Sequence, residues 1–233
     1  MSQDKTNALR TTQGRAKIWG LMVRIFVSVP DESLIAEVNA PAFRSFLEAY
    51  GQLGEANLST GVQEITAYLD SITKMDVETT LKLLMADRAR LFRSSANSTF
   101  KPPYENLYRP NPGENRLAAE LREFYKKENL SPDQLDSELP DYLGVELNFI
   151  YQLVQREADE WMIGDNALKT AVAEVEFLRQ HLGNWIGKYV AEARQSAATG
   201  FYRGFLTMLE GFIAMERTYL VGLTGHEDPP VVI

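Results

Sequence analysis

Residues 138–157 read ELPDYLGVELNFIYQLVQRE, a stretch with the signals of a helix that begins near its proline. Pro140 predicts the start, because proline is favoured in a first helical turn, where its missing N–H costs nothing. Asp141 and Glu146 follow within the first turns, where the helix dipole favours negative charge. Behind them, apolar residues recur at helical spacing at Leu143, Leu147, Ile150 and Val154. The stretch therefore predicts an α-helix over about 140–162.

The same helical spacing of apolar residues runs through most of the chain. It predicts further helices over about 18–29, 41–51, 62–72, 76–92, 117–124, 165–182 and 184–222, the last interrupted near Gly200. No segment shows a run of period-two alternation bounded by turns, which is the pattern of a half-buried strand. The chain is therefore predicted to be all-α, a globular helical bundle.

A stretch rich in serine, asparagine and proline interrupts this pattern over residues 93–115. It predicts a long loop with Tyr104 and Tyr108 between prolines, and loops of this length are usually functional or linking. The expected organisation is an N-terminal helical half (1–108), a connector or hinge with one helix (109–139), a C-terminal helical half (140–224) and a loose tail (225–233). Because hinged segments favour exchange between chains, a monomer and a domain-swapped dimer both remain open.

Composition narrows the class of protein. The chain has 233 residues, of which 45% are hydrophobic and 24% are charged, and this is ordinary for a soluble globular protein. It contains no cysteine, which excludes disulfides and thiolate metal sites, and its net charge of −8 argues against a nucleic-acid partner. The N-terminus lacks a secretory signal and no apolar stretch is long enough to span a membrane, so a cytoplasmic protein is expected.

Recognisable catalytic and metal-binding motifs are missing. The two histidines, His181 and His226, lie in no zinc or di-iron motif, and no nucleophile elbow is present. We therefore expect no catalytic residue, no metal and no cofactor. One alternative is a helical enzyme or nucleotide-dependent switch that uses the Gly183–Lys188 turn, which faintly resembles a phosphate loop, or the carboxylates Glu157 and Glu160. Another is a scaffold that binds a folded partner.

Five blocks of the sequence stand out: RAKIWGLMVRIFVSVPDESL, LLMADRARLFRSS with PPYENLY, ELPDYLGVELNFI, FLRQHLGNWIGKYV and GFYRGFLTMLEGFI. In the same order, these blocks resemble those of the TorD/DmsD/NarJ chaperones. The third is similar to the family signature of Pro-Asp-His followed by Glu-Leu-x-Phe, with Tyr142 in place of the histidine. The likeness extends from about residue 15 to 222, and it implies a TorD-like helical bundle.

The resemblance implies a cytoplasmic maturation factor for a molybdenum-containing redox enzyme. Such chaperones bind the N-terminal leader of the catalytic subunit, often a twin-arginine export signal, and hold the apo-enzyme until its molybdopterin cofactor is inserted. We expect an open, apolar groove with an acidic rim made by Glu138, Asp141 and Glu146 beside Pro140. Tyr104, Tyr108, Tyr142 and Trp19 are the expected aromatic walls, which also suit arginine. Arg90, in the second block, is a further candidate contact.

Overall fold

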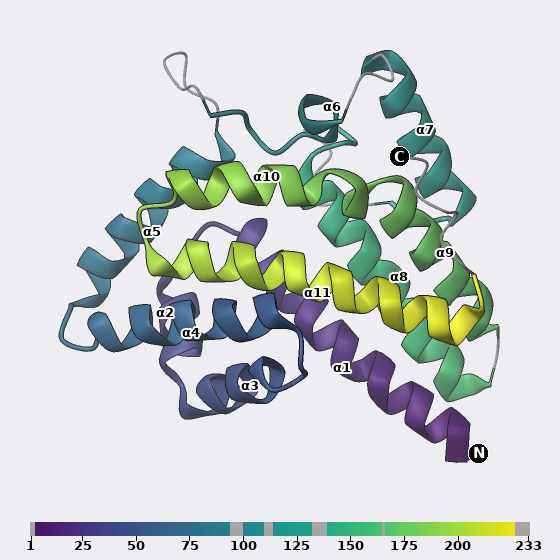
Figure 1. Ribbon diagram of the computed structural model, residues 1–233, viewed down its shortest axis with the longest axis horizontal. Helices are drawn as coiled ribbons and strands as arrows, with labels where there is room; N and C mark the ends of the chain where they lie inside the picture. The colour runs from purple at the N-terminus through teal and green to yellow at the C-terminus, as the bar shows by residue number, and fades with distance from the viewer. Residues whose placement is uncertain (1–2, 94–99, 110–113, 132–138, 165, 227–233) are drawn as a thin grey trace. The chain divides into compact units, whose positions relative to one another are not determined.

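The computed structural model describes residues 3–93, 100–109, 114–131, 139–164 and 166–226. Eleven helices make up the regular secondary structure of this part of the chain (Figure 1). They are α1 (Gln3–Phe26), α2 (Glu32–Asn39), α3 (Pro41–Gly51), α4 (Ala56–Ser71), α5 (Val77–Phe92), α6 (Glu105–Tyr108), α7 (Glu114–Lys127), α8 (Leu143–Ile163), α9 (Ala167–Gln180), α10 (Leu182–Ser196) and α11 (Gly200–Thr224). The predicted all-α class is confirmed.

The helix bounds differ from the predicted ones in several places, most at α1, which begins at Gln3 and not near residue 18, and at α4, which begins at Ala56 and not near residue 62. The expected break near Gly200 is confirmed, because α10 ends at Ser196 and α11 begins at Gly200. Helix α8 begins three residues later than predicted, at Leu143, and the short helices α2 and α6 were not predicted. Most of the tail, 227–233, lies outside the described residues. None of the described helices is long and apolar enough to cross a membrane.

The chain forms two compact units, each assembled from separate stretches. The first unit contains Met1–Val27, Tyr104–Trp185 and Glu216–Ile233, and the second contains Ser28–Pro103 and Ile186–Met215. These units do not follow the boundaries expected from the sequence. The predicted N-terminal half contributes to both, and the connector 109–139 lies inside the first. A hinge role for that connector stays a prediction.

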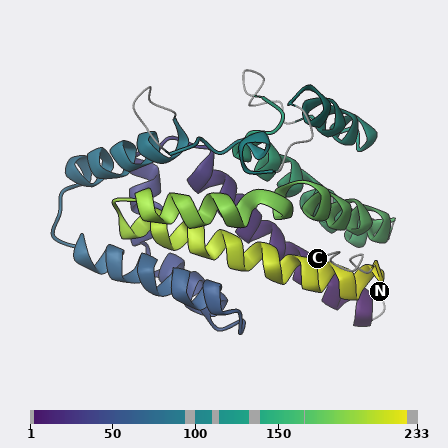
Figure 2. The same cartoon turned by 45° about the horizontal axis from the view of Figure 1, so that its top comes forward.

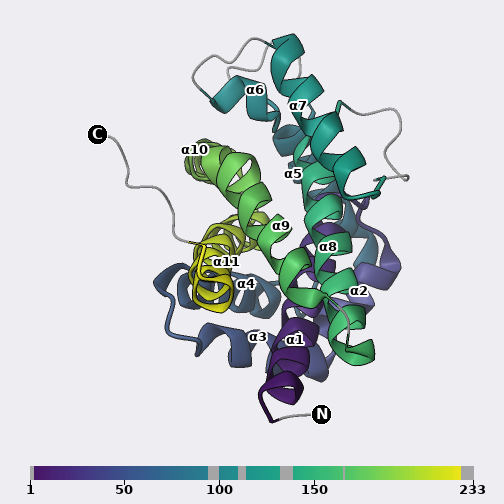
Figure 3. The ribbon, with the colours of Figure 1, turned by 90° about the vertical axis from the view of Figure 1, so that its right-hand side faces the viewer.

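In the first unit, a buried arginine joins four helices. Arg15 of α1 donates to Glu157 of α8, to Glu174 of α9 and to Glu216 of α11, and all four side chains are at most 5% exposed. Burial by itself lowers the pKa of Arg15, but the three carboxylates outweigh it and raise that pKa well above its usual value. Figure 3 shows α9 lying beside α8, the arrangement that this ion cluster holds together.

In the second unit, glycines allow two helices to approach closely. A Cβ atom added to Gly204 of α11 would lie 2.6 Å from Ile65 Cγ1 and 2.7 Å from the Gly61 carbonyl oxygen of α4. Helices α10 and α11 lie side by side (Figure 2), and Asp87 of α5 fixes the turn between them. Its carboxylate accepts the Ala198 and Thr199 N–H groups at 2.9 and 2.8 Å.

Replacing Gly204 tests the close packing of α4 against α11. We expect Gly204→Ala to lower the free energy of unfolding by about 1–3 kcal/mol, because the new methyl group overlaps Ile65 and the α4 backbone. Gly222→Ala, in the same helix, is the matched control: nothing lies within 4 Å of its added Cβ. Helix propensity should make this control more stable by up to about 1 kcal/mol. Equal effects in urea unfolding would contradict the packing argument.

Replacing Arg15 tests the buried ion cluster. We expect Arg15→Met to cost about 3–5 kcal/mol, because it leaves three buried carboxylates without their cation. Arg10→Met, at an exposed position of the same helix, should change stability by less than about 0.5 kcal/mol. Chemical denaturation of both variants at neutral pH measures the difference.

Candidate functional site

The N-terminal end of α8 is covered by another segment of the first unit. Tyr142 is the N-cap residue of α8 and makes no side-chain capping bond. Asp141, which precedes it, contacts another segment: its backbone oxygen accepts the Glu105 N–H at 2.9 Å, and its Oδ2 accepts the Asn106 N–H at 3.3 Å. Both donors belong to residues 104–109, which contain α6 and which we call the strap. The Asp141 carboxylate therefore binds the strap.

Aromatic and ionic contacts hold the strap at both ends. Tyr104 forms an isolated antiparallel bridge with Tyr142, and their ring centroids are 5.2 Å apart. At the other end, Tyr108 stacks on Trp185 of α10 at 5.8 Å. Arg109 donates to the Gln180 carbonyl oxygen at the end of α9 at 3.0 Å, and to Glu105 at 2.6 Å.

Three carboxyl groups are buried where the strap meets α8. Glu105, Asp141 and Glu146, which we call the acid cluster, are 0%, 3% and 0% exposed. Trp185 Nε1 donates to Glu146 Oε2 at 3.2 Å, and His181 Nδ1 lies 3.2 Å from Glu105 Oε2. Glu146 Oε1 is buried and receives no donor, and Glu146 forms a side-chain hydrogen bond with Glu105. Two carboxyl groups can share such a bond only when one of them carries a proton.

The electrostatics of the cluster favour a proton on Glu146. Burial raises the pKa of Glu146 well above its usual value, and the nearby Glu105 and Asp141 raise it further against the opposing effect of the Trp185 hydrogen bond. The pKa of Tyr125 is also raised, first by burial and then by the same three acids. Tyr125 stays a neutral donor, and its hydroxyl donates to the Pro140 carbonyl oxygen at 2.7 Å.

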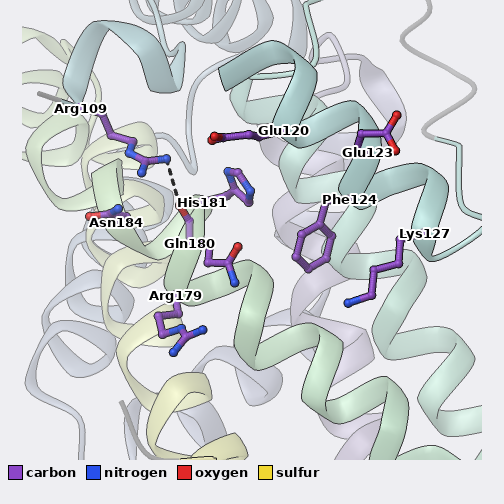
Figure 4. A pocket seen from close by; sticks show the side chains of 9 residues that line it. All are labelled: Arg109, Glu120, Glu123, Phe124, Lys127, Arg179, Gln180, His181 and Asn184. Carbon is purple, nitrogen blue, oxygen red and sulfur yellow. Dashed lines mark hydrogen bonds between the residues drawn. The ribbon is translucent and has the colours of Figure 1, made fainter. Parts of the chain in front are cut away.

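A polar cavity lies next to this cluster, within the first unit (Figure 4). Its volume is about 790 Å³. It is lined by Arg109, Glu120, Glu123, Phe124, Lys127, Arg179, Gln180, His181 and Asn184. The side chains of α7 and those around the end of α9 form its walls, and both signs of charge are present. Apart from Phe124, the described lining residues are charged or polar. The cavity is therefore not the apolar groove predicted from the sequence.

Among the described residues, no open acidic rim is present at the N-terminal end of α8. Asp141 and Glu146 are buried, and Glu138 lies outside the described residues. Pro140, Tyr108 and Tyr142 are also buried, whereas Tyr104 is half-buried. The prediction of an exposed rim was wrong because the strap supplies intramolecular partners to the residues that were expected to face solvent. The structure nevertheless brings Tyr104, Tyr108, Pro140, Asp141, Tyr142 and Glu146 together in one place.

Two candidate residues lie elsewhere. Trp19 is fully buried and donates through Nε1 to Glu216 Oε2 at 2.9 Å, so it belongs to the ion cluster of Arg15 and forms no aromatic wall. Arg90 belongs to the second unit, where it lies 3.4 Å from Asp87. Its side chain is 49% exposed. A peptide-binding role for Arg90 stays a prediction.

Sequence reasoning missed the strap side of the site. Glu105 and Arg109 were not predicted as site residues, although their spacing of four in a short segment is the pattern of a helical ion pair. His181 is the C-cap residue of α9, and the side chains of His181 and Trp185 meet different acids, Glu105 and Glu146. These pairings join segments far apart in the chain, so no local pattern reveals them.

The features behind the enzymatic alternative have structural roles. The Gly183–Lys188 stretch lies inside the continuous helix α10 and does not form a loop whose N–H groups surround a phosphate. Glu157 binds Arg15, and Glu160 accepts the Thr170 hydroxyl at 2.6 Å. Among the described residues, no group of three or more His, Cys, Asp and Glu side chains is arranged to hold a metal ion.

Comparison with known proteins places the chain in a family. A family model described as "Nitrate reductase delta subunit" matches residues 55–191, more than half of the chain. The chain belongs to this family. It is 24% identical over 211 residues to the chaperone protein TorD of Vibrio atlanticus, covering 89% of this chain and 95% of that protein. It is 30% identical over 112 residues to the perchlorate reductase assembly chaperone protein of Dechloromonas aromatica, covering 47% and 49%.

These matches confirm the resemblance to TorD/NarJ maturation chaperones that was inferred from five sequence blocks. A second TorD chaperone, from Shewanella piezotolerans, is 25% identical over 215 residues, covering 87% of this chain and 89% of that protein. The matching region includes both the strap and α8, because it spans nearly the whole chain. The names of these relatives agree with the predicted chaperone role, for which no catalytic residue was expected.

A neutral replacement of Glu146 tests its protonation. Because the folded-state pKa of Glu146 is raised, its contribution to stability is fully present below the unfolded pKa of about 4.3 and is lost as the pH rises through the folded value. Glu146→Gln keeps the shape of the protonated acid at every pH. We expect it to be more stable than the wild type by about 1–2 kcal/mol at pH 8, with a difference that shrinks towards pH 5.

Urea unfolding followed by tryptophan fluorescence at several pH values measures this difference. Glu123→Gln, at an exposed position of α7, is the matched control and should change little at any pH. A stability difference for Glu146→Gln that does not vary with pH would show that the carboxyl does not titrate in this range.

Proposed function

We propose that this protein is a maturation chaperone for the catalytic subunit of a molybdenum-containing oxidoreductase. It binds the N-terminal leader of that subunit and holds the apo-enzyme until the molybdopterin cofactor has been inserted. The observation that carries this proposal is the match to TorD chaperones along 89% of the chain. The perchlorate reductase assembly chaperone supports the same class of client.

The chemistry at the N-terminal end of α8 fits a leader of the twin-arginine type. Such a leader carries two arginines followed by a short apolar run. The acid cluster offers carboxyl groups that accept charge-assisted hydrogen bonds from a guanidinium. Tyr142 and Trp185 offer aromatic faces, which favour arginine as well as apolar side chains. Leu139, which directly precedes Pro140, is 54% exposed and adds accessible apolar surface.

The apolar run and the two arginines of such a leader contribute different amounts of binding free energy. Burying about 350 Å² of apolar surface contributes about 9 kcal/mol before the cost of ordering the peptide is subtracted. An arginine that reaches a buried carboxylate must first lose its hydration, and this cost offsets most of the attraction. A contact at a partly exposed edge is worth about 1 kcal/mol. The apolar run therefore supplies most of the affinity, and the arginines set the register and the selectivity.

Affinity capture from a native lysate tests the proposed partner. Tagged protein should recover one large subunit of a redox enzyme, and deletion of the N-terminal leader of that subunit should abolish recovery. A scaffold that binds a folded partner would retain a leaderless subunit. An enzyme or nucleotide switch would instead show turnover or tight nucleotide binding by the purified protein.

Calorimetry with the synthetic leader of the recovered subunit tests the ranking. We expect polar substitutions in the apolar run to weaken binding by more than replacement of both arginines by lysine. A larger loss from the lysine peptide would show that guanidinium recognition dominates.

A further inference from the structure

The strap is attached mainly at its two ends and leaves part of its own surface open to solvent. Leu107 is 36% exposed and the Arg109 side chain is 22% exposed. By contrast, the N-terminal half of α8 is anchored by fully buried side chains, those of Leu143, Leu147 and Ile150. Glu105 and Tyr108 of the strap are buried as well, but the strap holds only a four-residue helix, and such a short segment opens locally at lower cost than a long core helix.

The strap also places a third carboxyl group, that of Glu105, beside those of Asp141 and Glu146. Glu105 is the strap's contribution to the acid cluster, whereas Asp141 and Glu146 belong to the segment that starts α8. Glu105 faces Arg109 and His181 as well as the other two acids, so its attachment combines attraction with repulsion. Removal of the strap returns Glu105 to water and separates it from the Asp141 carboxylate.

What the strap covers matches the chemistry of an arginine-bearing segment. Without the strap, Asp141 loses the two N–H donors of Glu105 and Asn106, and Glu146 loses its side-chain hydrogen bond with Glu105. The uncovered surface is therefore a pair of acids beside the aromatic rings of Tyr142 and Trp185, with which the strap tyrosines now stack. A guanidinium supplies the missing donors, and an apolar residue replaces a stacked tyrosine.

From this arrangement we propose that residues 104–109 form a detachable strap, an internal competitor that occupies the N-terminal end of α8 until the client leader displaces it. The inference rests on the proposed leader binding, because it names how access to that same site is controlled. It makes the apparent affinity for the leader equal to the intrinsic affinity multiplied by the fraction of molecules whose strap is open. Weakening the strap strengthens binding, and fixing it in place abolishes binding.

A reversible crosslink tests whether the strap must leave. The chain has no cysteine, and Tyr104 and Tyr142 face each other in an antiparallel bridge. The Cα atoms of such pairs are about 4.5–5.5 Å apart, within the range that a disulfide spans. The double variant Tyr104→Cys/Tyr142→Cys should lose leader binding by at least about tenfold when oxidised and regain it on reduction. The two single-cysteine variants are controls that should not respond to reductant.

A second variant releases the strap without changing α8. Arg109→Ala removes the contacts to Glu105 and to the end of α9, and we expect it to bind the labelled leader about tenfold more tightly than the wild type. Arg116→Ala is the matched control, because Arg116 also pairs with a glutamate four residues away, Glu120, but lies on the exposed face of α7. It should leave leader affinity unchanged. If the reduced double-cysteine protein itself binds poorly, the comparison of these two arginine variants decides the question.

Hydrogen exchange of the protein alone separates the strap from the client. We expect the Glu105 and Asn106 amides to exchange at least about tenfold faster than the Ile150 amide of α8, and to slow on oxidation of the crosslink. Strap amides as protected as Ile150, or oxidised protein that binds the leader as well as reduced protein, would overturn the proposal. If wild-type protein does not bind the leader at all, the proposed function fails, while the exchange result still decides whether the strap opens.

Discussion

A single guanidinium, that of Arg15, is the interaction on which the first unit depends. It joins α1 to carboxylates on α8, α9 and α11, and these helices bring together stretches that are distant in the chain. Three acids surround one cation, and burial raises the pKa of Glu174 well above its usual value despite the attraction of Arg15. Charge pairing with Arg15 and the raised pKa of Glu174 together reduce the repulsion among the three acids. The stability of the cluster therefore depends on Arg15.

Helix α8 carries a buried glutamate near each end, and the two are neutralised in different ways. Glu157 meets Arg15, whereas Glu146 meets two other acids and tends to keep its proton. The two residues are about three helical turns apart and so lie on similar sides of the helix. Since Arg15 holds one end of α8 in place, the other end is presented to the strap in a defined orientation. The ion cluster thus positions the candidate site without being part of it.

The family relationship and the structure contribute different parts of the functional argument. Membership of the nitrate reductase delta subunit family, with TorD chaperones matching most of the chain, supports a role in assembling another protein. It does not say how this chain would reach a flexible client segment. The structure adds that the residues suited to such a segment are covered by the chain's own tyrosines and by Glu105. Under the proposed leader binding, recognition is an exchange of one segment for another.

The sequence by itself determined the all-α class, most helix positions and the family, because helical periodicity and block order are local properties of the chain. It also selected Tyr104, Tyr108, Asp141, Tyr142 and Glu146, which do lie together. Only the tertiary structure decided that these residues are buried, that Trp19 belongs to the Arg15 cluster and that Glu105 and His181 complete the site. The physical reason is that burial and ion pairing depend on contacts between distant segments, and such contacts leave no periodic mark on either segment alone.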